Sequence, residues 1–146
     1  MLRRARDDES DAIAALFRRS KETALPYLPD LHTVAEDRAF FREHVFATCQ
    51  VWVAEANGEL LGFCAFRDGW IDHLYVSPAH QRAGIGTALL GEAMRRNDSL
   101  RLWTFQRNTA ARRFYESRGF FAEMTTGGEN EEREPDVLYR RGRAPT

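Results

Sequence analysis

The stretch that decides the fold is HLYVSPAHQRAGIGTALL, residues 73–90. A short apolar run ends in a polar break, two glycines follow one residue apart at Gly84 and Gly86, and a helical pattern of apolar residues begins. Glycine lets the backbone turn tightly and present consecutive N–H groups. Because a helix N-terminus adds unpaired donors and a positive dipole end, the stretch predicts a site for an anion such as pyrophosphate. A purely structural turn is the alternative.

Two other phosphate-binding motifs do not fit these residues. A dinucleotide-binding fingerprint requires a third glycine three residues after Gly86, where the chain has Leu89, and the preceding turn SPAHQRA is too long. A P-loop requires a lysine after its second glycine, whereas Gly91 is followed by Glu92. Both nucleotide-binding interpretations therefore fail.

Strand and helix patterns flank this stretch on both sides. Apolar alternation around the turn Asn57-Gly58 indicates a hairpin, and helical spacing appears before and after it. The order β-α-α-β-β-β-α-β-α-β-β predicts a mixed α/β (α+β) sheet domain without repeats or linkers. Strands are expected over residues 2–6, 50–56, 59–66, 69–76, 100–105, 120–124 and 135–139, and helices over 33–46, 84–96 and 108–119. A first helix, with Asp7, Asp8 and Ser10 as candidate N-caps, is expected to end where the proline segment 25–32 begins.

Composition narrows the class of protein. A chain of 146 residues fits one domain, 1–146, and 43% hydrophobic with 29% charged residues is typical of a globular protein. A net charge of −1 offers no basic field to a nucleic acid. The chain has no signal-peptide pattern and no apolar run near ~18 residues, so we expect a cytoplasmic protein without membrane attachment. Cys49 and Cys64 have apolar neighbours, as buried free thiols do.

Several motifs together resemble those of one family. QRAGIG, residues 81–86, is similar to the signature Q/R-x-x-G-x-G/A of the GNAT superfamily of acyl-CoA-dependent N-acetyltransferases. LYVSP before it resembles that family's fourth strand, and NTAARRFYESRGF, residues 108–120, resembles its N-x-x-A-x-x-F-Y-x-x-x-G-F segment. LRRARDDESDAIAALF at the start also looks like a GNAT first strand and helix. The resemblance thus spans essentially the whole chain in the family's order.

The resemblance implies a fold and a cosubstrate, acetyl-CoA. The fold is a single GNAT-like domain with a mixed, mostly antiparallel sheet of six to seven strands and about four helices, in which strands four and five splay apart around the thioester. Main-chain groups of the fourth strand pair with the pantetheine arm, the glycine loop holds the pyrophosphate, and Asn108 contacts the cofactor. The implied cofactor-binding residues are Leu74, Tyr75, Val76, Gln81, Arg82, Ala83, Gly84, Ile85, Gly86, Thr87 and Asn108.

Acetyl transfer to an amine requires a neutral nucleophile and a protonated leaving thiolate. The resemblance implies Tyr115 as the general acid, and a phenol whose pKa is about 10 can donate that proton. Asp72 is our preferred base, acting directly or through a water; His73, or no protein base at all, are the alternatives. Period-2 alternation on a strand sends Asp72 and His73 to opposite faces, so one of them is expected to face the cleft.

In a GNAT-like fold, two loops of this chain are expected to border the acceptor-binding side of the cleft. These are the proline loop LPYLPDLH, residues 25–32, and the acidic loop TTGGENEEREPD, residues 125–136. Tyr27, His32, Glu131 and Glu132 are the candidate substrate residues. The acidic loop favours a cationic primary amine, with a plain solvated charge run as the alternative.

The resulting hypothesis is direct transfer from acetyl-CoA to a small-molecule or peptide amine in a ternary complex. Neither cysteine has the electropositive setting of an acyl-carrying thiol, and the histidines lack the spacing of a metal site. We therefore expect no metal, no nucleic acid and no membrane partner, in a monomer or homodimer. The alternative is a noncatalytic acyl-CoA-binding sensor on the same fold.

Overall fold

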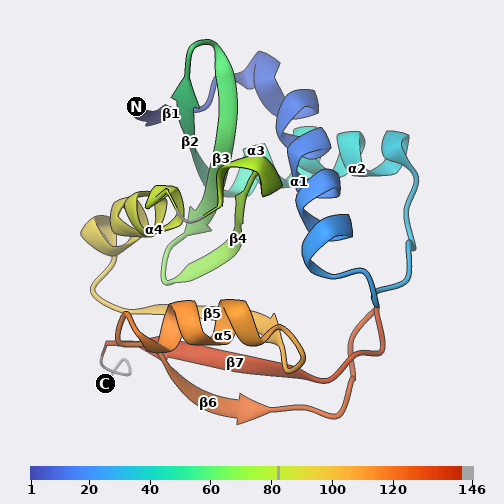
Figure 1. The fold of residues 1–146 in the computed structure, drawn as a ribbon, viewed down its shortest axis with the longest axis vertical. Coiled ribbons are helices and arrows are strands. Elements are labelled where there is room, and N and C mark those ends of the chain that lie inside the picture. Colours follow the sequence, from blue (N-terminus) through green and yellow to red (C-terminus); the bar gives the residue numbers. More distant parts are fainter. Residues whose placement is uncertain (82, 143–146) are drawn as a thin grey trace.

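The computed structural model describes residues 1–81 and 83–142 (Figure 1). The elements alternate in the order expected from the sequence when α2, a π-helical turn over Phe41–Val45 and α3 are taken as one helical region. The strands are β1 (Leu2–Arg4), β2 (Gln50–Ala56), β3 (Glu59–Arg67), β4 (Trp70–Val76), β5 (Leu100–Phe105), β6 (Phe121–Thr125) and β7 (Asp136–Arg141). The helices are α1 (Ser10–Ala24), α2 (Val34–Phe40), α3 (Phe46–Thr48), α4 (Ile85–Arg96) and α5 (Thr109–Glu116), with 3₁₀ turns at Asp7–Glu9 and Pro78–His80.

One mixed sheet of seven strands carries the fold, in the order β1-β2-β3-β4-β5-β7-β6. Neighbouring strands are antiparallel except β4 and β5, which are parallel. Those two strands share one registered pair, Trp70 with Arg101, close to the beginning of each strand. Beyond that pair they part, which confirms the expected splay of strands four and five.

Helices cover both faces of the amino-terminal half of the sheet. Figure 1 shows β2, β3 and β4 between α4 on one side and α1 with α2 on the other. Ile13 of α1 and Phe41 of the π-helical turn pack with Phe63 of β3, whereas Leu89 of α4 packs with Phe66 on the opposite face. These apolar stripes follow helical spacing, as expected for helices that bury one face.

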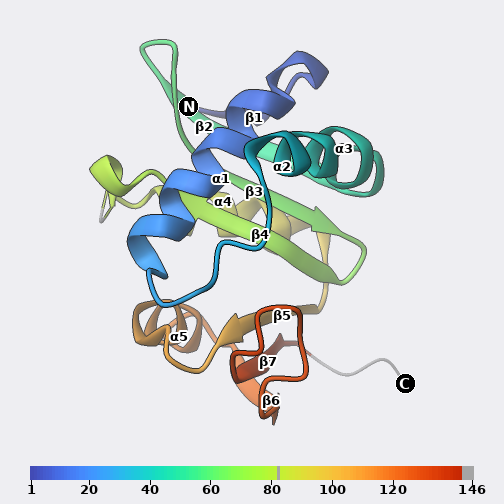
Figure 2. The same cartoon turned by 90° about the vertical axis from the view of Figure 1, so that its right-hand side faces the viewer.

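The carboxy-terminal half is a smaller layer. Strands β5, β7 and β6 lie beside α5, and Figure 2 shows this unit below the α1 side of the molecule. Tyr115 of α5 packs with Tyr139 of β7, at a ring-centroid distance of 6.5 Å. The two halves therefore meet along the parting strands β4 and β5.

The proline loop crosses from α1 to α2 at the end of the molecule nearest this seam. Its start is fixed where Leu25 N–H donates to the Lys21 carbonyl, and Pro26 follows with no N–H to continue the helix. A capping box then starts α2, in which Thr33 and Glu36 bond each other's backbone N–H. Arg18 of α1 holds the crossing by pairing with Asp37 at 2.5 Å.

No helix among residues 1–81 and 83–142 has the length and apolar content that a membrane crossing demands.

Candidate active site

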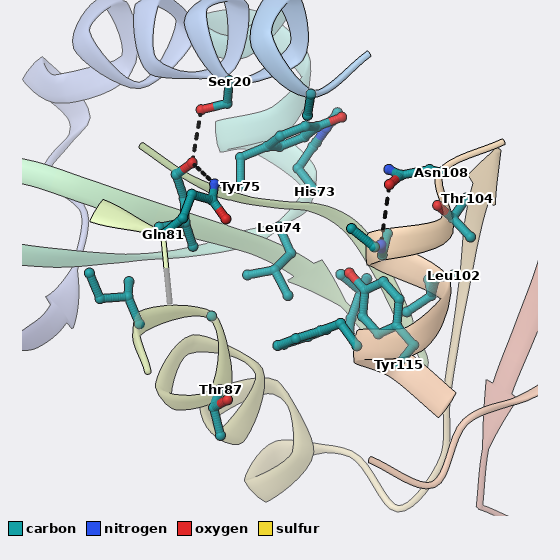
Figure 3. A pocket seen from close by; sticks show the side chains of 18 of the residues that line it. Ser20, His73, Leu74, Tyr75, Gln81, Thr87, Leu102, Thr104, Asn108 and Tyr115 are labelled. Atoms are coloured by element: carbon teal, nitrogen blue, oxygen red, sulfur yellow. Dashed lines mark hydrogen bonds between the residues drawn. The ribbon is translucent and has the colours of Figure 1, made fainter. Parts of the chain in front are cut away.

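A cavity of about 570 Å³ lies where β4 and β5 part. Figure 3 shows its walls: β4 at the centre, the end of α1 above, the start of α4 below and α5 on the right. A pocket of this size falls within the range of small-molecule and cofactor sites. The cavity thus brings residues 71–76, the glycine loop and the segment around Asn108 to one place.

The open edge of β4 forms the floor of this cavity. Leu74, Tyr75 and Val76 line it, and β5 pairs with this strand at Trp70. The Val76 carbonyl, which faces away from β3, accepts hydrogen bonds from the Ser20 hydroxyl at 3.3 Å and the Gln81 amide at 2.9 Å. A strand edge of this kind can add another extended chain by main-chain pairing.

The glycine loop ends at the amino terminus of α4. Gly84 adopts φ +78°, the left-handed region that glycine enters without strain, and serves as the helix N-cap. An added Cβ at Gly86 would lie 3.4 Å from the Phe114 ring, so α4 begins close against α5. The cavity is lined here by Gly84, Ile85, Gly86 and Thr87. The first N–H groups of α4 are therefore directed at this end of the cavity.

Three residues of the predicted cofactor-binding loop, Gln81, Arg82 and Ala83, differ from Gly84 and its neighbours. Arg82 lies outside the described residues. Ala83 is exposed and is not among the residues that line the cavity. Gln81 lines it, but its amide group is used to hold the end of β4.

Arg118 is a cation at the glycine-loop end that sequence reasoning missed. Its guanidinium donates to the Thr87 hydroxyl at 2.6 Å and stacks 3.9 Å from the centre of the Phe114 ring. The predicted contact residue Asn108 also lines the cavity and caps α5, accepting from Ala111 N–H at 3.2 Å. In the sequence, Arg118 resembles any arginine near a helix end, so no local signal distinguishes it.

Tyr115 lies on α5 with its side chain at the cavity (Figure 3). It is 8% exposed and packs edge-on against Phe114 and Phe120, at ring distances of 5.1 and 5.4 Å. Burial raises the pKa of its hydroxyl above the ordinary value near 10. The group therefore keeps its proton throughout the neutral range and is available as a donor.

A β-bulge places both candidate bases at the cavity. The register between β3 and β4 shifts between Ala65 and Phe66, which leaves Asp72 as the extra residue. Ile71 consequently packs on the α4 side, whereas His73 contacts Phe17 on the α1 side. Both residues border the cavity, and which of the two serves as the base stays a prediction.

Asp72 and His73 differ in their surroundings. Both carboxylate oxygens of Asp72 accept from Arg67, at 2.8 and 3.1 Å, and one also accepts from the Cys49 thiol at 3.4 Å. His73 instead lies among aromatic rings, and burial lowers its pKa to about 4. At neutral pH His73 is therefore uncharged, whereas Asp72 forms an ion pair with Arg67.

None of the four candidate substrate residues is part of the cavity lining. His32 of the proline loop contacts Glu131 of the acidic loop through its Nε2 atom. Tyr27 lies under Arg107, whose guanidinium is 3.9 Å from the ring centre. The fold thus brings the two loops together, as expected, while the cavity wall itself is made by other residues, Trp103 and Phe105 of β5 among them.

The two thiols have the character of structural cysteines. Cys64 is fully buried, and burial raises its pKa; burial likewise raises the pKa of Cys49 to about 11. Both are protonated at neutral pH and neither is activated as a nucleophile. Within the described parts of the chain, no group of three or more potential metal ligands comes together.

Sequence comparison supplies the family. A model described as an acetyltransferase (GNAT) domain matches residues 47–121. The chain is 32% identical over 121 residues to the peptidyl-lysine N-acetyltransferase YiaC of Escherichia coli strain K12, a match that covers 82% of each protein. The chain belongs to the GNAT acetyltransferase family. This membership confirms the resemblance found in the motifs and the expected GNAT-type N-acyltransferase.

Solved GNAT structures agree with the fold. The solution structure of apo YjaB from Escherichia coli superposes with a TM-score of 0.81 at 21% identity, over 98% of both chains. The PaiA N-acetyltransferase of Thermoplasma acidophilum, solved in complex with coenzyme A, gives a TM-score of 0.73 at 17% identity, also over 98% of both chains. The chain therefore shares its overall fold with these two solved structures.

Proposed function

We propose that this protein transfers an acetyl group from acetyl-CoA to a primary amine, directly within a ternary complex, with residues 1–146 acting as one catalytic domain. The observation that carries the proposal is that one cavity holds an open strand edge, a helix N-terminus and the Tyr115 hydroxyl. An acyl donor whose extended pantetheine arm leads from the thioester to a diphosphate matches that order of features. The raised thiol pKa values of Cys49 and Cys64 speak against an acyl-enzyme route.

The residues present suit the chemical parts of acetyl-CoA. The edge of β4 at residues 74–76 offers main-chain groups to the amides of the pantetheine arm. The N–H groups of α4 after Gly84, with the helix dipole, suit the diphosphate, and Arg118 adds a cation beside Thr87. Bound there, the cosubstrate supplies the thioester whose acetyl group is transferred.

Tyr115 acts as the general acid in this proposal. Its hydroxyl lines the cavity, and burial holds its pKa high, so it is protonated when the thiolate leaves. The same desolvation raises the pKa of a thiol, which keeps proton transfer from phenol to sulfur feasible inside the cavity. General-acid catalysis of this kind contributes about 10² to 10⁴ in rate.

Asp72 acts as the base, through an intervening water. Asp72 lines the cavity, and both of its carboxylate oxygens accept hydrogen bonds from Arg67. A water molecule that also donates to one of these oxygens would carry the proton from the amine to the carboxylate. His73 is a poorer candidate because, with a pKa of about 4, it is uncharged at neutral pH and offers no negative charge to the ammonium that must lose its proton.

The acceptor is a primary amine that enters between the proline and acidic loops. This direction is supported by the contact of His32 with Glu131, which places the acidic loop over that side of the molecule. The relative YiaC is named a peptidyl-lysine N-acetyltransferase, and a lysine side chain is a primary amine of this kind.

The test combines calorimetry with an amine panel. Acetyl-CoA binding is measured directly, and release of free thiol is followed with polyamines, aminoglycosides, amino acids and lysine peptides. We expect Tyr115→Phe to lower kcat by at least 100-fold without changing the Kd for acetyl-CoA.

Tyr139→Phe is the matched control, because the Tyr139 hydroxyl accepts a hydrogen bond from Arg112 and donates one to Glu116, and Tyr139 does not line the cavity. It should keep kcat within a few-fold of the parent. Turnover by Tyr115→Phe equal to the parent on every accepted amine would overturn the acid role. Absence of CoA binding at millimolar concentration would overturn the proposed function as a whole.

A further inference from the structure

The acceptor end of the cavity, where the proline and acidic loops reach it, is lined by apolar side chains. Leu25 begins the proline loop and lines the cavity. Phe105 also lines it, and pairs in the sheet with Asp136, the last residue of the acidic loop. Ala24 of α1 and Trp103 of β5 belong to the same stretch of the lining. Each loop therefore meets the cavity at a residue without charge.

Charged side chains are scarce in the cavity wall. Among the described lining residues, Asp72 is the one carboxylate and Arg118 the one guanidinium, and no lysine is present. Arg118 stands at the glycine-loop end beside Thr87, and Asp72 is paired with Arg67. A second ammonium on the acceptor would find no unpaired carboxylate in this lining, and burying a charge without a partner is costly.

The acidic loop directs its carboxylates at groups of the protein itself. Glu131 contacts His32 of the proline loop, and Glu134 pairs with Arg107. Asp136 accepts hydrogen bonds from two side chains of the same loop. No residue of 125–136 is part of the described cavity lining. The negative charge of the loop therefore gives no reason to expect a polycationic acceptor inside the cavity.

Trp103 is the side chain at this end that is available to a ligand. It lines the cavity although it is 44% exposed. Leu102 before it packs with Tyr115, so alternation along β5 turns the indole to the opposite face of the sheet. On that face Tyr75 of β4 contacts Phe17 of α1, at a ring distance of 5.2 Å. An indole open to a cavity offers a large apolar surface on which another ring can pack.

We infer that the acceptor carries its primary amine on an uncharged body with an aromatic ring, and that this ring packs against Trp103. An arylalkylamine has this form, whereas a polyamine or an aminoglycoside brings further charges to an apolar wall. The inference names the class of acceptor and rests on the proposed acetyl transfer to a primary amine.

Three primary amines of similar shape test the inference: 2-phenylethylamine, 2-cyclohexylethylamine and 2-(1-methylpiperidin-4-yl)ethylamine. The third adds a positive charge in the ring, on a nitrogen that cannot be acetylated to a stable amide. With the parent protein we expect kcat/KM for this amine to be at least about tenfold below that of the cyclohexyl compound. The phenyl compound should exceed the cyclohexyl compound by about threefold or more, since aromatic rings gain from packing on one another.

Trp103→Ala should raise KM for 2-phenylethylamine by about tenfold, because the ring loses its packing partner. The kcat and the Kd for acetyl-CoA should stay within a few-fold of the parent, a split that a general loss of structure would not give. Trp103→Phe keeps an aromatic ring and should restore most of the affinity.

Phe121→Ala is the matched control. Phe121 of β6 is also 44% exposed but does not line the cavity. Its replacement should leave KM unchanged for all three amines.

The outcomes separate the two proposals. Equal kcat/KM for the cyclohexyl and methylpiperidinyl amines, equal kcat/KM for the phenyl and cyclohexyl amines, or an unchanged KM for 2-phenylethylamine in Trp103→Ala overturns the inference and leaves acetyl transfer standing. If the parent binds acetyl-CoA and acetylates none of the three amines or the wider panel, the proposed function fails and the inference fails with it.

Discussion

The two ends of the cavity are built in different ways. At the glycine-loop end, residues 74–76 and 84–87 lie close together in sequence and offer mainly backbone groups: the edge of β4 and the start of α4. At the acceptor end, side chains arrive from three separate segments, represented by His32, Arg107 and Glu131. In the proposed function, the first end binds the acetyl-CoA donor and the second end receives the amine acceptor.

This difference predicts how substitutions divide between the two ends. Changes near the glycine loop should alter the affinity for acetyl-CoA and leave the acceptor KM alone. Changes at the loops should do the reverse. Four variants test the division, from the largest expected effect to the smallest.

Asp72→Asn should lower kcat about 100-fold, because the amide cannot take the proton that the carboxylate relays. The Kd for acetyl-CoA should be unchanged, since Asp72 lies on the bulge and apart from the glycine loop. Single-turnover kinetics and calorimetry measure the two quantities. Arg67→Gln is the control that keeps the carboxylate; an equal loss of kcat in both variants would make Asp72 a structural residue.

His73→Phe should remove a part of the acid sensitivity of folding. The folded-state pKa of about 4 lies below the value near 6.5 expected for the unfolded chain. Between these values the unfolded chain binds a proton that the folded protein excludes, so stability falls as pH falls.

By linkage, His73 accounts for a loss of about 2 kcal/mol between pH 6.5 and 5. Denaturant unfolding at both pH values measures it, and the phenylalanine variant should lose about that much less than the parent. The same pH dependence in both proteins would contradict a buried, neutral imidazole at the acceptor end.

Gly84→Ala should weaken acetyl-CoA binding up to about tenfold and lower stability by about 1–2 kcal/mol, because a left-handed conformation strains an L-residue. The space around Gly84 is open, so the effect is conformational and not steric. Gly91→Ala within α4 is the control: it should raise stability by up to about 1 kcal/mol and leave binding alone. An acceptor KM that changes with Gly84→Ala would break the division.

Arg107→Ala should raise the acceptor KM by about three- to fivefold, since it frees Glu134 and uncovers Tyr27. An exposed pair of this kind is worth no more than about 1 kcal/mol. Steady-state kinetics with the best amine measure the effect, with the exposed Arg19→Ala of α1 as control. An altered affinity for acetyl-CoA would show that the two ends are coupled.

The fold was largely predictable, because its signals are local. Hydrophobic periodicity, the Asn57-Gly58 hairpin and the glycine turn each depend on neighbours in sequence, and all correspond to observed elements. The bulge at Asp72 was not predictable from alternation, because a bulge is a property of the pairing with β3. Strict alternation therefore could not anticipate that Asp72 and His73 both border the cavity.

At the acceptor end, the sequence predicted only that the proline loop and the acidic loop would border the acceptor. Tyr75 was expected to serve through its main chain alone, and Arg118 was not expected at all. Their positions depend on contacts with Phe17 and Thr87, which are far away in sequence. No local pattern marks a side chain whose role comes from such packing.

The sequence by itself determined the order of the elements, the turn at Gly84 and the family, because backbone conformation and periodicity are set over a few residues at a time. The tertiary structure alone decided which side chains share the cavity. It brought Glu131 of the acidic loop to His32 of the proline loop and tied Asp72 to Arg67, through loop contacts and strand pairing. The physical reason is the sequence separation of the groups involved. Backbone groups that would bind the cofactor lie within a few residues of one another, whereas the side chains at the acceptor end come together only when distant segments pack.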